Sequence, residues 1–189
     1  AVPASELTAR LNELRRVMSA THPDWKMILL DNKIDLYYFT GTMQEGALVI
    51  TPDEAVLFVR HSYECAVRDS RFPDIRPLGS FRGIASAFPE IPETVYVAAR
   101  TMTLQKLTVL QKYLPFAPSP IDGILSGLRS VKSEYELDCM RHAGKIHAKV
   151  LETVAPALLR PGLSEARLCA EICTSMLDHG AMCISRYNQ

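Results

Sequence analysis

Residues 128–146 read LRSVKSEYELDCMRHAGKI, and the signals in this stretch decide how the chain is divided. Ser133 is suited to cap a helix, and Glu136, three residues later, can complete a capping box. Behind this start, apolar residues recur every three or four positions, the period of one buried helix face: Leu137, Met140, Ala143, Ile146, Val150 and Val154. We therefore predict one α/β unit before this helix and a second unit that begins with it.

The composition is that of an ordinary folded protein. Of the 189 residues 48% are apolar, and 21 basic side chains balance 21 acidic ones. A net charge of zero gives no electrostatic reason to expect nucleic acid or an anionic membrane as a partner. No apolar run approaches the roughly 18–20 residues that span a bilayer, and the first residues do not resemble a signal peptide. Five cysteines, an odd number, favour reduced thiols and a cytoplasmic location.

The first 120 residues alternate between helical and strand-like patterns. Helices are expected over residues 5–19, 62–67, 81–88 and 103–113. Strands are expected over residues 26–30, 47–50, 56–59 and 95–98 and near residue 75. The pattern of residues 34–41 does not decide between a helix and a strand. Strands that alternate with helices favour a mixed sheet with helices packed on it.

The boundary between the two units is expected near residues 120–130. Residues 114–120 contain three prolines, a composition that resists helix and is typical of an extended connector. A short helix is expected to follow it. We therefore assign residues 1–120 to an N-terminal domain, 121–132 to a linker and 133–189 to the start of a second domain.

Three stretches, in order along the chain, resemble the creatinase, prolidase and aminopeptidase P family. The first, residues 35–66, contains a Tyr-Phe-Thr-Gly turn, a hairpin and an Arg/Tyr-containing helix start, although Val59 and Arg60 stand where the family usually has Asp before its Arg. The second is similar to the signature that opens the family's catalytic domain, through Arg129, Val131, Lys132, Glu134, Glu136, Leu137, Met140, Arg141 and Ala143. The third is the Pro-Gly-x-Ser-Glu restart at residues 161–165, whose helix ends at His179-Gly180. The resemblance implies a ribonuclease-H-like N-terminal α/β domain with a mixed sheet and flanking helices. The first helices of a truncated pita-bread domain would follow it.

The same resemblance implies that the parent protein is a metallopeptidase, an Xaa-Pro aminopeptidase or dipeptidase. Two divalent metal ions (Mn, Co or Zn) would be held by two Asp, one His and two Glu, from strands later than the one expected at residues 182–185. We therefore expect a fragment without catalytic or metal-binding residues, inert alone. The implied partners are a peptide substrate and a second copy, in a homodimer through the N-terminal domain. A creatinase-like amidinohydrolase and a non-catalytic dimerisation or binding module remain open as alternatives.

One loop is a candidate for shaping substrate access. In the family the N-terminal domain lies over a catalytic cleft, often that of a neighbouring subunit, and the turn after the Tyr-Phe-Thr-Gly motif reaches it. Here that turn is Thr42, Met43, Gln44 and Glu45, which we expect to be an exposed polar loop. The alternative is a solvated hairpin connector, since most loops are only connectors.

The other polar candidates have simpler interpretations. Cys169 and Cys173 lie four apart on an expected helix, with Cys183 beyond, and could in principle bind zinc. We favour packing roles for them, because free cysteine is among the most buried residue types. Arg129 and Lys132 are expected to be solvated or bound to carboxylates at helix ends.

Overall fold

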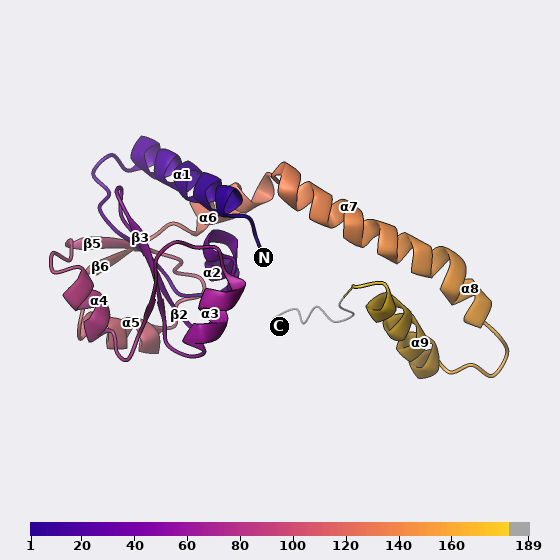
Figure 1. The fold of residues 1–189 in the computed structure, drawn as a ribbon. Helices are drawn as coiled ribbons and strands as arrows, with labels where there is room; N and C mark the ends of the chain where they lie inside the picture. The colour runs from indigo at the N-terminus through magenta and orange to yellow at the C-terminus, as the bar shows by residue number, and fades with distance from the viewer. Residues whose placement is uncertain (182–189) are drawn as a thin grey trace. The chain divides into compact units, whose positions relative to one another are not determined.

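A computed structural model describes residues 1–181 (Figure 1). Its contacts divide the chain into two units, Ala1–Val131 and Lys132–Gln189. The strand expected at residues 182–185 lies outside the described residues. Within them, no helix is both long and apolar enough to cross a lipid bilayer.

The first unit is built on a six-stranded sheet in the order β4-β3-β2-β1-β5-β6. The strands are β1 (Ile28–Leu30), β2 (Gly46–Ile50), β3 (Ala55–Val59), β4 (Ile75–Pro77), β5 (Thr94–Val97) and β6 (Ala117–Pro120). The central pairs β1–β2 and β2–β3 are antiparallel, and the outer pairs β1–β5, β5–β6 and β3–β4 are parallel. The predicted mixed sheet is confirmed.

Helices cover both faces of this sheet. They are α1 (Ala4–Thr21), α2 (Lys33–Thr40), α3 (Tyr63–Asp69), α4 (Arg82–Ala87), α5 (Leu104–Gln111) and α6 (Asp122–Ser130). Alternate strand residues point to opposite faces, and one set packs with Ile84 of α4 and Leu110 of α5. Figure 1 shows α4 and α5 on one side of the sheet and α1, α2 and α6 on the other. The second strand set is also fully buried, at Ile28, Leu30, Leu48, Ile50 and Leu57.

The undecided segment after β1 is helix α2. Asn32 caps it by accepting a hydrogen bond from the Asp35 N–H. Gly41 ends it with φ +74°, a left-handed conformation that glycine adopts without steric cost. The caps at Asn32 and Gly41 therefore favour a helix, where the apolar periodicity did not decide between a helix and a strand.

The segment that we interpreted as a connector is an edge strand. The Ala117 N–H donates to the Glu93 carbonyl (2.6 Å) and the Ile121 N–H to the Val97 carbonyl (3.0 Å), which pairs β6 with β5. Backbone N–H groups of alternate strand residues point to the same neighbour, so with Ala117 and Ile121 donating to β5 the nitrogens of Pro118 and Pro120 face away from it. Their missing N–H groups cost no ladder hydrogen bond there. The short helix expected after this segment is α6, which belongs to the first unit, so the division between the two units falls after Val131.

The second unit is helical over its described residues. It contains α7 (Glu134–Lys149), a π-helical turn (Val150–Val154), α8 (Ala155–Leu158) and α9 (Glu165–Asp178). The predicted capping box is confirmed: Ser133 Oγ accepts from the Glu136 N–H (3.2 Å), and the Glu136 carboxylate accepts from the Ser133 N–H (3.0 Å). Ser164 likewise caps α9, as predicted.

The predicted buried face of the long helix is fully buried only toward its C-terminal end. Ile146 and Val150 are buried, whereas Met140 is 57% exposed. Within this unit α9 contacts the π-helical turn and α8. Burial of the apolar face is therefore concentrated toward the C-terminal end of α7 and the turn that follows.

Candidate functional site

The predicted access loop connects α2 to β2, and its four residues differ in exposure. Thr42 is buried and Gln44 is half-buried, whereas Met43 and Glu45 are exposed. The expectation of an exposed polar loop is therefore wrong for Thr42. Two residues earlier, the Thr40 carbonyl accepts a hydrogen bond from the buried Ser70 hydroxyl. Met43, Gln44 and Glu45 are therefore the loop residues that can meet another molecule.

The exposed end of the loop is fixed to strand β3. The Arg60 N–H donates to the Glu45 carbonyl (2.7 Å), and the two side chains form an ion pair with 3.7 Å between Nη1 and Oε1. Arg60 also lines a pocket of about 160 Å³ with Leu78, Gly79, Ser80, Phe81, Val109 and Tyr113. Glu45, Arg60 and this pocket are therefore contiguous. Sequence analysis missed the pocket because its residues come from separate segments.

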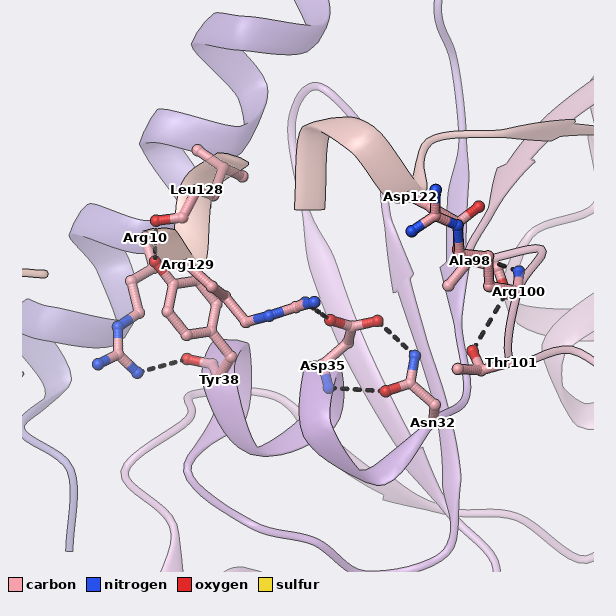
Figure 2. Close-up of polar contacts among 10 residues, drawn as sticks. All are labelled: Arg10, Asn32, Asp35, Tyr38, Ala98, Arg100, Thr101, Asp122, Leu128 and Arg129. Atoms are coloured by element: carbon pink, nitrogen blue, oxygen red, sulfur yellow. Dashed lines mark hydrogen bonds and ion pairs between the residues drawn. The ribbon is translucent and has the colours of Figure 1, made fainter. Parts of the chain in front are cut away.

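A partly buried polar network joins α1, α2 and α6 (Figure 2), and we define it as Arg10, Asn32, Asp35, Tyr38 and Arg129. The Asp35 side chain is only 4% exposed and forms an ion pair with Arg129 of α6. The Asn32 amide donates to the same carboxylate. We expected Arg129 to be either solvated or bound to a carboxylate at a helix end. It binds such a carboxylate, since Asp35 lies in the first turn of α2.

The charge state of Asp35 is set by opposing effects. Burial raises the pKa of this carboxyl, while the hydrogen bond from Asn32 and the charge of Arg129 lower it. The neighbouring carboxylates of Asp122 and Asp31 add a smaller upward contribution. Arg129 is thus the cation that favours ionised Asp35 in a site where burial favours the neutral acid.

Arg10 and Tyr38 extend the network to helix α1. Arg10 Nη1 donates to the Tyr38 carbonyl (2.7 Å), and its guanidinium lies 4.3 Å from the centre of the Tyr38 ring. The Tyr38 hydroxyl donates to the Leu128 carbonyl of α6 (3.3 Å). The network therefore fastens α1, α2 and α6 to one another.

Two further carboxylates lie where strands β1 and β6 end. Asp31 forms an ion pair with Lys106 of α5 (2.6 Å), and its other oxygen, Oδ1, is buried without a hydrogen-bond partner. Asp122 accepts from the Ala99 and Arg100 N–H groups (3.1 and 3.0 Å) and so caps the chain after β5. Asp122 and Arg100 are labelled in Figure 2. Asp31 and Asp122 are both engaged in holding the fold.

The described residues do not assemble a metal centre. Among residues 1–181, no group of three or more His, Cys, Asp or Glu is placed to hold a metal ion. Cys169 and Cys173 lie on α9, with Cys169 exposed and Cys173 half-buried, which differs from the packing role that we favoured for both. Cys183, the third member of the zinc hypothesis, lies outside the described residues.

Solved structures share this fold. An Xaa-Pro dipeptidase from Bacillus anthracis matches with a TM-score of 0.80 and 20% identity, over 92% of this chain and 50% of that one. A prolidase from Pyrococcus furiosus matches at 0.76 and 22%, over 90% and 53%. An X-Pro aminopeptidase from Thermotoga maritima MSB8 matches at 0.76 and 18%, over 90% and 49%. The chain thus spans about half the length of these proteins.

The sequence comparisons identify a family but no individual relative among the curated proteins. No curated protein sequence matches the chain significantly. The family model described as the Creatinase/Prolidase N-terminal domain, however, matches residues 10–131, which cover the sheet and end where the first unit ends. The chain therefore belongs to the creatinase/prolidase N-terminal domain family.

Proposed function

We propose that this chain is the N-terminal part of a metal-dependent peptidase that hydrolyses the bond before proline, as an aminopeptidase or a dipeptidase. The observation that carries the proposal is the fold, which matches three such peptidases over at least nine tenths of this chain. The family match over residues 10–131 supports it independently. A cytoplasmic location and a homodimer through the first unit belong to the same proposal.

The catalytic metals would be held elsewhere in the parent protein. In the proposal, two divalent ions (Mn, Co or Zn) supply the Lewis acid and activated water of peptide hydrolysis. The described residues offer no site that fits them, so we assign no step of the reaction to this chain. We expect the 189 residues alone to be inactive.

The test compares two proteins: the 189-residue chain and the product of its complete open reading frame. Each is incubated with Xaa-Pro dipeptides and with Xaa-Pro-Xaa tripeptides in Mn²⁺, Co²⁺ or Zn²⁺, and again after chelation. We expect chelator-sensitive cleavage by the longer product only. Cleavage by the 189 residues would contradict their inactivity. Hydrolysis of creatine but not of Xaa-Pro peptides would replace the peptidase proposal with the amidinohydrolase alternative.

The access loop carries a second expected result. In the longer product, replacing Gln44 and Glu45 by alanine should raise KM for Xaa-Pro peptides by about two- to fivefold with little change in kcat. The reason is that exposed charge contacts contribute up to about 1 kcal/mol and act on binding. Steady-state kinetics measures both constants.

Glu13→Ala is the matched control for the loop. Glu13 is also an exposed glutamate paired with an arginine, Arg16 (2.7 Å), but it lies on α1. Its replacement should leave KM unchanged. If the loop variant behaves like this control, residues 42–45 are only a connector.

A further inference from the structure

Two cysteines lie one turn apart on the surface of helix α9. Cys169 and Cys173 are at i and i+4, which places them on the same face of the helix. Cys169 is exposed and Cys173 is half-buried, and neither is in a disulfide. The pKa of the Cys169 thiol is raised, chiefly by a hydrogen bond with Cys173, which agrees with this placement on one face.

Their spacing is unsuited to a direct disulfide within the helix. Residues at i and i+4 have Cβ atoms about 5–6 Å apart. A disulfide needs Cβ atoms about 3.5–4.5 Å apart. Joining the two sulfurs directly would therefore distort α9, whereas one atom placed between them would span the gap without moving the backbone.

The surroundings limit which bridging atom fits. Structural zinc is held by four protein ligands, and no group of three His, Cys, Asp or Glu is available among residues 1–181. An atom that needs only two sulfur ligands from the protein, because its third substituent is already attached, can be held by Cys169 and Cys173 alone. Trivalent organic arsenic, with one carbon substituent and two exchangeable positions, is of this kind.

We propose that Cys169 and Cys173 form a dithiol site that chelates monosubstituted trivalent arsenicals. In the reaction two S–As bonds form and the arsenic–oxygen bonds break. The oxygen leaves as water with the two thiol protons, and no atom changes oxidation state. No oxidant or reductant is required.

The test uses phenylarsine oxide and intact mass in a Cys183→Ser background, so that the thiol outside the described residues cannot take part. We expect one phenylarsenic adduct per chain that survives a monothiol wash and is removed by ethanedithiol. Cys169→Ser and Cys173→Ser should each release the adduct at least about 100-fold faster. Arsenic held by one sulfur is lost when that single S–As bond breaks, whereas with two sulfurs the broken bond can re-form within the same chain. Circular dichroism should show unchanged helix content on binding.

Two variants separate the helical dithiol from thiols in general. Cys139→Ser removes an exposed cysteine of α7 and should leave the adduct intact. The double change Cys173→Ser/Thr174→Cys keeps the number of thiols but moves the second one to i+5, off the shared face, and should weaken the adduct as the single variants do. Adducts that persist without Cys169, or disappear with Cys139, would overturn the proposal.

Discussion

Replacing Gly46 by alanine is expected to lower the unfolding free energy of the first unit by about 3 kcal/mol, near the upper end of overpacking costs. A Cβ atom at this position would lie 2.0 Å from the Phe58 carbonyl oxygen and 3.1 Å from the Val59 Cα. Both are backbone atoms of β3, so no side-chain rotation can relieve the clash. Either β2 and β3 separate at this end or the register there changes.

The single tryptophan makes the measurement simple. Trp25 lies in the first unit and is 4% exposed, so its fluorescence reports the unfolding of that unit in urea. Gly127→Ala is the matched control, because nothing lies within 4 Å of a Cβ at that position in α6. It should raise stability by up to about 1 kcal/mol, the difference in helix propensity. Equal unfolding midpoints for the two variants would contradict the close approach at Gly46.

The same glycine connects stability with the access loop. Gly46 pairs with Val59, which brings the preceding Glu45 against Arg60. A strand end displaced by an added methyl group would carry Glu45 with it. In the longer product, Gly46→Ala should therefore reproduce the rise in KM of the loop variant at temperatures where the protein remains folded.

Local signals predicted most of the elements, and tertiary context explains the failures. Helix caps and turns act within a few residues, so the starts of α7 and α9 could be predicted from Ser133 and Ser164. Strand β6 could not, because its composition resembles a connector. The prolines are tolerated only because β6 is at the edge of the sheet and the nitrogens of both face away from β5. That fact depends on which strands are neighbours.

In the candidate site, too, local signals could be predicted and contacts between distant residues could not. The access loop could be located from its motif, but the burial of Thr42 could not, and the carbonyl of nearby Thr40 is bonded by Ser70, 30 positions along the chain. Asp35 and Arg129 are 94 positions apart. No local pattern joins them, and an exposed arginine at the end of α6 is an ordinary expectation. A buried aspartate in the first turn of α2 was the available signal, and it needs the fold before it can be recognised.

The ion pair between Asp35 and Arg129 should be costly to break from one side. Arg129→Met leaves a carboxylate that is 4% exposed without its cation. Removing one partner of a buried pair typically costs about 3–5 kcal/mol, and because Arg129 itself is 31% exposed we expect about 2–3 kcal/mol at neutral pH. The double variant Asp35→Leu/Arg129→Met should recover about 1 kcal/mol or more relative to the sum of the single variants, since no charge is then left buried.

The pH dependence identifies the cause of this loss. Burial already raises the pKa of Asp35, so the folded state holds this proton more tightly than the unfolded state. The resulting stability is fully present below the ordinary pKa of an aspartate and declines as pH rises through the folded pKa. Arg129→Met removes a charge that lowers this pKa, so its folded value should rise further. The loss of stability caused by Arg129→Met should then be small in acid and grow as pH rises until Asp35 is ionised.

Urea unfolding of both proteins between pH 3 and pH 8, followed by Trp25 fluorescence, measures this difference. Arg76→Met is the control, because Arg76 forms a similarly short pair with Asp74 (2.6 Å) on an exposed surface, with the two side chains 44% and 37% exposed. Exposed pairs contribute about 0–1 kcal/mol, so its effect should stay below that of Arg129→Met at neutral pH. A loss for Arg129→Met that is the same at pH 3 and pH 8 would mean that Arg129 acts by packing its stem against α2. In that case the charge of Asp35 would not be what fastens α6 to α2.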